Sequence, residues 1–210
     1  WIKEIGIHRP EFASYLYYMY KRLVACKKVL KNTGSIYLHC DYRASHCLKM
    51  VMDEIFRVEN FQNEIIWHYG LGGSSRKRWQ RKHDVILFYS KGKKWWFTPI
   101  MVPATSQRMK GQMKKDDDVW DIPTINNMAK ERLGYPTQKP LILLEKIIKA
   151  SSNGDDIVLD PFCGCATTVI AAHKLNRKWI GIDISSDACM VMQKRFEAMF
   201  GFTPKIYPVE

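Results

Sequence analysis

The sequence DIVLDPFCGCATTVIAAHKLNRKWIGIDIS at residues 156–185 decides the fold class. Two short apolar runs, 157–159 and 179–182, each precede a segment whose apolar residues recur at helical spacing. The order strand–helix–strand–helix is typical of a parallel sheet joined by crossover helices, and continuous apolar runs are typical of strands buried on both faces. We therefore predict an α/β fold with strands over 156–160 and 178–183 and helices over 167–175 and 186–200.

Both predicted strands end in an aspartate, Asp160 and Asp183, 23 residues apart. Ligands of open α/β sheets bind beyond the carboxyl ends of the strands, where an acid on the second strand can accept ribose hydroxyls. Gly164 would let the backbone approach a ligand closely. The loop lacks the glycine fingerprint of dinucleotide enzymes, and an acid on the first loop suits a cationic group better than a pyrophosphate. The alternative is a tight turn whose acid caps a helix.

Working outward from this stretch, the same periodicity arguments predict the remaining elements. They are helices over 11–31 and 44–56, strands over 35–40, 64–69 and 85–89, an irregular region over 91–135, and a helix over 138–150 with Thr137 as N-cap and Pro140 in its first turn.

The chain has 210 residues, of which 46% are hydrophobic, and this excludes wholesale disorder. That length predicts one domain, or one domain with a small insertion. No apolar run approaches the roughly 18 residues of a membrane helix, so we expect no membrane association. Six cysteines without a zinc-like spacing are expected to be free thiols, and no metal site is predicted.

Nearly all of the net charge of +12 comes from one region of the chain. Twelve basic residues lie between Arg76 and Lys115, where Asp84 is the single acid, and tryptophans are interleaved with them. Localised cations with aromatic residues indicate a phosphate-backbone partner, whereas the alternative is a solvated loop. The candidate nucleic-acid contacts are Arg76, Lys77, Arg78, Arg81, Lys82, Lys93, Lys94, Arg108 and Lys110.

Three motifs carry a resemblance to a known family: YPTQKP at 135–140, LDPFCGCATT at 159–168 and WIGIDIS at 179–185. In this order they resemble the N4/N6 amino-methyltransferases of DNA in their permuted, beta-class arrangement. The earlier segments 34–41, 63–67 and 83–91 are similar to that family's middle strands, so the resemblance covers roughly residues 10–200.

The resemblance implies a seven-stranded, mostly parallel Rossmann-like sheet with one antiparallel strand, with S-adenosylmethionine as cofactor and DNA as partner. It implies a cytoplasmic, DNA-associated enzyme that methylates N6 of adenine or N4 of cytosine, and it leaves a homodimer and a restriction-modification partner open. It divides the chain into an N-terminal half of the methyltransferase domain (1–90), a target-recognition-like insertion (91–135) and a cofactor-binding half (136–210). The implied cofactor-binding residues are Thr137, Lys139, Pro140, Asp160, Phe162, Cys163, Gly164, Asp183 and Ile184.

Two departures from the family pattern matter. Ala166 stands where the family usually has a second glycine, which we expect to be tolerated if the backbone there avoids positive φ. The family's catalytic Asp/Asn/Ser-Pro-Pro-aromatic tetrapeptide is absent, because the sequence contains no Pro-Pro. We expect that tetrapeptide to precede Trp1 in a longer protein, together with a central strand between the strands at 35–40 and 156–160. The catalytic residues are then unknown, and the chain alone is predicted to be inactive.

Three functions remain open from the sequence. The first is a DNA amino-methyltransferase or a fragment of one. The second is a catalytically incomplete, methyltransferase-like module that binds nucleic acid. The third is a dinucleotide-dependent oxidoreductase, which the missing glycine fingerprint disfavours.

Overall fold

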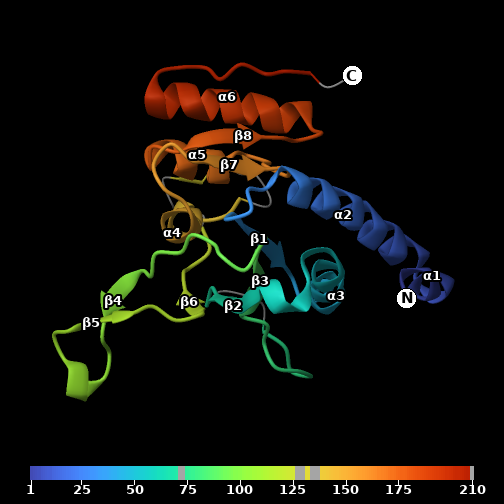
Figure 1. Cartoon of the computed structure of the whole chain (residues 1–210), viewed down its shortest axis with the longest axis horizontal. Coiled ribbons are helices and arrows are strands. Elements are labelled where there is room, and N and C mark those ends of the chain that lie inside the picture. The colour runs from blue at the N-terminus through green and yellow to red at the C-terminus, as the bar shows by residue number, and fades with distance from the viewer. Residues whose placement is uncertain (71–73, 126–130, 133–137, 209–210) are drawn as a thin grey trace. The chain divides into compact units, whose positions relative to one another are not determined.

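The computed structural model of the chain describes residues 1–70, 74–125, 131–132 and 138–208 (Figure 1). The chain forms two compact units. The first unit comprises residues 1–97 and 116–121, and the second comprises residues 98–115 and 122–210. In the part of the chain that the structure describes, no helix has the length and apolar character needed to cross a membrane.

The first unit is a four-stranded sheet with helices. Its strands lie in the order β1-β3-β2-β6, and β3 runs antiparallel to β1 and β2 while β6 pairs parallel with β2. A single strand therefore opposes the others, as predicted. The elements are α1 (Ile2–His8), α2 (Pro10–Val29), β1 (Ser35–Cys40), α3 (Ser45–Phe56), the 3-10 helix η1 (Val58–Asn60), β2 (Phe61–His68), β3 (His83–Ser90) and β6 (Val119–Asp121).

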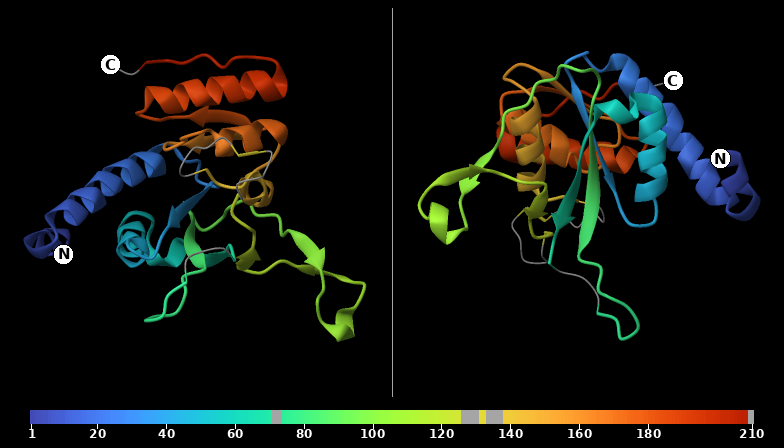
Figure 2. Two further views of the ribbon diagram at one scale, coloured as in Figure 1. Left: turned by 180° about the vertical axis from the view of Figure 1, so that it is seen from behind. Right: turned by 60° about the horizontal axis from the view of Figure 1, so that its bottom comes forward.

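The core of the first unit lies between one face of this sheet and the helices α2 and α3. Val85, Leu87 and Tyr89 alternate along β3, so their side chains share a face. Leu16 and Leu23, seven residues apart on α2, lie on one stripe of that helix and join the same cluster. Figure 2 shows the two long strands β2 and β3 side by side, with the described residues 74–82 before β3 extending beyond the strand ends.

The second unit contains the deciding stretch. β7 and β8 pair in parallel, from Ile157 opposite Lys178 to Asp160 opposite Gly181, and α5 connects them. A separate antiparallel hairpin is formed by β4 and β5. The elements are β4 (Met101–Pro103), the 3-10 helix η2 (Gln107–Met109), β5 (Met113–Lys115), α4 (Leu141–Ser151), β7 (Ile157–Asp160), α5 (Thr167–Lys174), β8 (Lys178–Gly181) and α6 (Ser186–Phe200).

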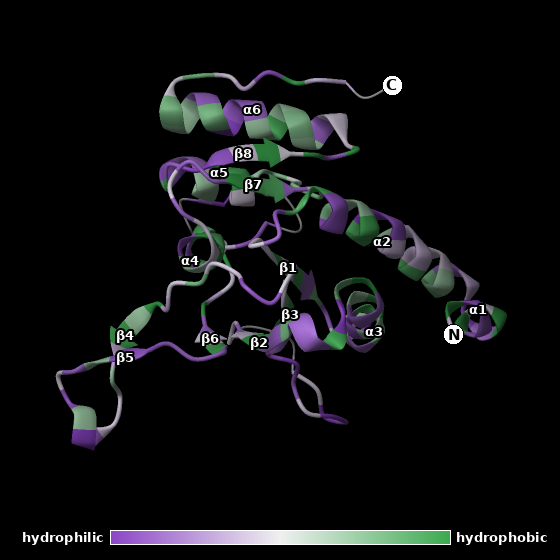
Figure 3. Cartoon of the chain, in the orientation of Figure 1, coloured by the Kyte–Doolittle hydropathy of each residue, from purple (hydrophilic) through white to green (hydrophobic). Residues whose placement is uncertain are grey.

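The prediction that β7 and β8 are buried on both faces is wrong. Val158 and Trp179 pack against a cluster from α4 and α5, but Ile157 is 58% and Ile180 50% exposed. Alternate residues of a strand point to opposite faces, so the helices cover one face only. Figure 3 shows the hydrophobic character that remains on both strands.

The predicted start of the 138–150 helix is also wrong. α4 begins at Leu141 with Pro140 in the N-cap position, and Thr137 lies outside the described residues. The Leu141 amide donates a hydrogen bond to the Glu131 carboxylate at 3.2 Å. A side chain from outside the helix therefore satisfies one of the amides at the start of α4 that the helix itself leaves without a partner.

Among the described residues, β1 and β7 each pair with one strand only, β3 and β8 respectively. This leaves a free edge on both sheets. The central strand that we expect to lie between them stays a prediction, as does the division into segments 1–90, 91–135 and 136–210.

Candidate functional site

Asp160 ends β7 and organises the turn that follows it. Its Oδ1 accepts a hydrogen bond from the Phe162 amide at 3.0 Å. Burial raises the pKa of this carboxyl group, and the nearby charge of Asp183 raises it further, while hydrogen bonds from Thr168 and the Phe162 amide oppose the shift. An acid that is costly to ionise is a common feature of sites that bind a cationic ligand.

Asp183 joins the two predicted loops. Its Oδ2 accepts a hydrogen bond from the Gly164 amide at 2.8 Å, and its Oδ1 accepts one from the Ser185 amide at 2.9 Å. Backbone bonds reinforce the junction, because the Cys163 amide donates to the Ile182 carbonyl at 2.9 Å. Each carboxylate oxygen has two lone pairs, so Asp183 can still accept hydrogen bonds from a ligand's hydroxyls.

Two glycines shape the backbone around the first loop. Gly164 has φ +48°, in the left-handed region. Gly181 faces Cys163 so closely that a Cβ there would lie 3.1 Å from its sulfur. Burial raises the pKa of the Cys163 thiol to about 12, with smaller contributions from Asp160 and Asp183. The thiol is therefore neutral at physiological pH and packs as an apolar group.

Two apolar side chains flank the aspartates and remain open to solvent. Phe162 is 42% exposed and Ile184 is 94% exposed. Phe162 lies two residues after Asp160, and Ile184 directly follows Asp183. Both therefore belong to the loops that meet at this junction. Exposed apolar groups beside an acid that can bind hydroxyls suit a ligand with a flat apolar part next to a ribose.

The described part of the third motif, residues 138–140, lies in the same unit and directly precedes α4. Leu141 packs against the cluster that contains Ala166, Val169 and Ile170, at the start of α5. Lys139 and Pro140 directly precede Leu141, so the fold brings this part of the motif toward the first loop. Their assignment to the cofactor site stays a prediction.

We expected Ala166 to be tolerated if its backbone avoids positive φ. That condition is not met, because this residue has φ +69° and ψ +25°. Its methyl group is fully buried and packs with Val169, Ile170 and Phe196. The turn therefore demands a left-handed residue, for which glycine is best suited, and the buried methyl offsets part of the strain.

Arg195 was not identified from the sequence. It lies on α6 and is buried, and its Nη1 donates to the Cys165 carbonyl at 2.9 Å and to the Thr167 hydroxyl at 3.1 Å. Arg195 therefore holds the end of the first loop, where it enters α5. A signal was available: Ala188, Met192 and Arg195 fall at i, i+4 and i+7, so the arginine stands on the buried stripe of the helix.

The candidate basic residues that belong to the first unit lie near the two opposite ends of β3. Arg76, Lys77, Arg78, Arg81 and Lys82 belong to the connection between β2 and β3, before β3 begins. Lys93 and Lys94 follow the other end of β3. The strand has eight residues, so at the usual rise per residue it separates the two groups by about 25 Å.

The remaining two candidates, Arg108 and Lys110, are exposed in the hairpin of β4 and β5, in the second unit. The nine basic candidates therefore come from three places in the fold. Contact of each with DNA stays a prediction.

A polar and aromatic cluster lies where β1 ends and β3 begins. The Nε2 of His39 and the Oδ2 of Asp84 are 3.0 Å apart, and the His39 and Trp67 rings meet edge to face at 5.7 Å. Trp67 also meets Tyr69 at 5.4 Å. Asp84, the single acid of the basic region, thus pairs with a histidine from another strand, which sequence spacing did not indicate.

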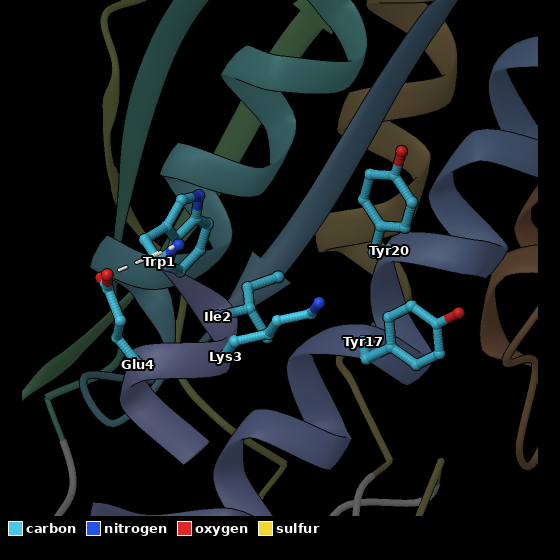
Figure 4. Close-up of a pocket in the computed structure, with 6 residues that line it drawn as sticks. All are labelled: Trp1, Ile2, Lys3, Glu4, Tyr17 and Tyr20. Atoms are coloured by element: carbon cyan, nitrogen blue, oxygen red, sulfur yellow. Dashed lines mark ion pairs between the residues drawn. The ribbon is translucent and has the colours of Figure 1, made fainter. Parts of the chain in front are cut away.

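A hollow between α1 and α2 has a volume of about 500 Å³ (Figure 4). It is lined by Trp1, Ile2, Lys3, Glu4, Tyr17 and Tyr20. Nothing in this lining matches the paired aspartates and tight loops of the second unit, so we place the candidate site at the ends of β7 and β8.

Solved structures with a similar fold include the complex of M1.HpyAVI with SAM, with a TM-score of 0.66 and 24% identity over 86% of this chain and 82% of that chain. Another is the cytosine-N4-specific PvuII DNA methyltransferase, with a TM-score of 0.69 and 17% identity over 87% of this chain and 70% of that chain. At these identities the similarity shows the fold.

Relatives in sequence include the type II methyltransferase M.HpaI of Haemophilus parainfluenzae, 33% identical over 194 residues, and the DNA adenine methyltransferase YhdJ of Escherichia coli (strain K12), 32% identical over 197 residues. These alignments cover 90% and 86% of this chain, and 62% and 66% of the two relatives. The chain therefore spans less than two thirds of their length.

The sequence profile of the DNA methylase family, which groups the N6 and N4 methyltransferases, matches residues 8–194. The match includes both loops of the candidate site and the basic connection between β2 and β3. The chain therefore belongs to the N6/N4 DNA methylase family.

Proposed function

We propose that this chain is the cofactor- and DNA-binding part of an enzyme that transfers a methyl group from S-adenosylmethionine to the exocyclic amine of adenine or cytosine in DNA. The observation that carries the proposal is the Asp183 carboxylate, which ties the loops of β7 and β8 together at 2.8 Å from the Gly164 amide. Parallel strands expose such loops at one edge of a sheet, where nucleoside ligands bind.

The residues of these loops fit S-adenosylmethionine. Asp183 retains lone pairs for the ribose hydroxyls, and Phe162 and Ile184 offer apolar surface for the adenine. The Asp160 carboxyl, whose pKa burial raises, would be stabilised in its ionised form by a neighbouring cation. We further assign Thr137, Lys139, Pro140, Cys163 and Gly164 to this site, of which Thr137 lies outside the described residues.

When bound, S-adenosylmethionine supplies an electrophilic methyl group on a positively charged sulfur. The loops of this chain bind and orient the donor, which leaves the amine of the target base to be aligned with it. That amine is paired inside a duplex, so the base must leave the stack. Acceptors for the amine hydrogens belong to the family's Pro-Pro tetrapeptide, which this sequence lacks, so we assign no catalytic residue here and expect no transfer by the 210 residues alone.

The exposed cations of the connection between β2 and β3 would bind phosphates, since the sequence from 74 to 82 contains five basic residues and no acid. Lys93, Lys94, Arg108 and Lys110 are weaker candidates because they lie in other parts of the fold. A cytoplasmic location, a homodimer and a restriction-modification partner follow from the family resemblance alone and stay predictions.

Calorimetry of the 210-residue chain with S-adenosylhomocysteine and with NAD tests the cofactor assignment. We expect binding of the first and none of the second. NAD binding without S-adenosylhomocysteine binding would contradict the proposal and favour an oxidoreductase.

The missing tetrapeptide favours one second candidate, a methyltransferase-like module that holds DNA without chemistry. Methyl transfer to DNA by a longer protein with the native residues before Trp1 separates the two functions. We expect transfer by the longer protein only. Transfer by the 210-residue chain itself would show that our account of the catalytic part is wrong.

A further inference from the structure

Trp79 is the most exposed large apolar side chain of the described residues, at 95%. It stands in the sequence SSRKRWQRK at residues 74–82, directly after Arg78 and two residues before Arg81. A single exposed apolar residue needs no explanation by itself. An indole surrounded in sequence by cations, in residues 74–82 that extend beyond the sheet (Figure 2), has a more specific meaning.

Two contacts hold the part of this connection next to β3 in place. The Tyr69 amide donates to the Lys82 carbonyl at 3.0 Å, which continues the pairing of β2 and β3 by one step. The Arg81 guanidinium lies over the Tyr42 ring at 3.8 Å from its centre, just beyond the end of β1. The Trp79 side chain is therefore presented from an anchored base.

The connection lies at the end of the sheet where β1 and β2 finish and β3 begins. The His39–Asp84 pair and the edge of Trp67 lie at that end, which is the side on which open α/β sheets bind their ligands. Trp79 therefore belongs to the segment at the end of this sheet where ligands of such sheets bind.

We propose that Trp79 is a wedge that enters the base stack of duplex DNA and stabilises the gap left when a base is turned out. This inference rests on the proposed function, because it takes DNA as the partner. Charge complementarity selects DNA over a protein, since residues 74–82 carry five cations and no acid. Proteins that kink or open a duplex insert apolar side chains between base steps, and an indole stacks on any base.

A wedge has a measurable preference. Unstacking costs least where a base is already missing, so the chain should bind a short duplex with a central abasic site more tightly than the same duplex fully paired. Base–aromatic stacking predicts a preference of about tenfold. We expect Trp79→Ala to abolish most of it and Trp79→Phe to retain part, with an unchanged salt dependence because no charge is altered.

The matched control is Trp96→Phe, which alters another exposed tryptophan beyond the far end of β3 and should leave the preference intact. Circular dichroism confirms that each variant is folded. If Trp79→Ala keeps the wild-type preference, or the wild type shows none, the wedge is refuted while DNA as partner stands. If the wild type binds neither duplex, both the wedge and the proposed DNA partner fail.

Discussion

The carboxylate of Asp183 accepts the backbone amide of Gly164 at 2.8 Å, although the two residues are 19 positions apart in the sequence. Its other oxygen accepts the Ser185 amide at 2.9 Å. One side chain therefore fixes the loop that follows β7 against the loop that follows β8.

We expect Asp183→Asn to weaken binding of S-adenosylhomocysteine at least tenfold and to lower the free energy of unfolding by about 1–3 kcal/mol. An asparagine can accept one of the two amides, but its NH₂ group then faces the other amide as a second donor. Calorimetry and urea unfolding measure both effects. Asp187→Asn, in the first turn of α6, is the control and should cost about 1 kcal/mol or less. Equal losses of affinity and stability in the two variants would show that Asp183 does not hold the two loops together.

We expect Asp160→Asn to stabilise the ligand-free protein at neutral pH while weakening cofactor binding. The pKa of Asp160 is raised in the folded protein, mainly by burial, so stability is lost as pH rises from the ordinary value of 3.8 through the raised pKa. The variant avoids that loss, and its advantage should vanish below about pH 4. Urea unfolding across this pH range measures it. If the stability advantage of the variant grows toward acid pH, the pKa of Asp160 is not raised in the folded protein.

We expect Ala166→Gly to leave the free energy of unfolding within about 1 kcal/mol of the wild type. Relief of the left-handed backbone gains about 1–2 kcal/mol, while loss of the buried methyl and the greater flexibility of glycine together cost a similar amount. Ala171→Gly is the control, since Ala171 is equally buried but inside α5, and it should cost about 2 kcal/mol. Equal losses in the two variants would contradict the strain at Ala166.

We expect Arg195→Met to destabilise the second unit by about 3 kcal/mol, because the Cys165 carbonyl and the Thr167 hydroxyl lose a charged donor. Methionine preserves much of the apolar packing of the stem, and Arg195→Lys should recover part of the loss. Thermal unfolding measures both. The neighbouring Lys194 is exposed, and Lys194→Met should change stability by no more than about 0.5 kcal/mol. A similarly small change at Arg195 would show that the loop holds without it.

The sequence by itself determined the α/β class, the order of elements in 156–200 and the two aspartates at the strand ends. Periodicity of apolar residues is a local property, and parallel strands necessarily bring their carboxyl ends together. For the same reason the Asp160–Asp183 neighbourhood was predictable, and the structure places both residues at one junction.

Only the tertiary structure decided which partners meet across long separations. It revealed the left-handed Ala166, Arg195 beneath the loop, and the separation of Lys93 and Lys94 from the cations near Arg81 by the length of β3. It also left Ile157 exposed where the apolar run predicted burial. Each of these depends on the register between elements and on which face a neighbour covers, and neither is encoded in local spacing.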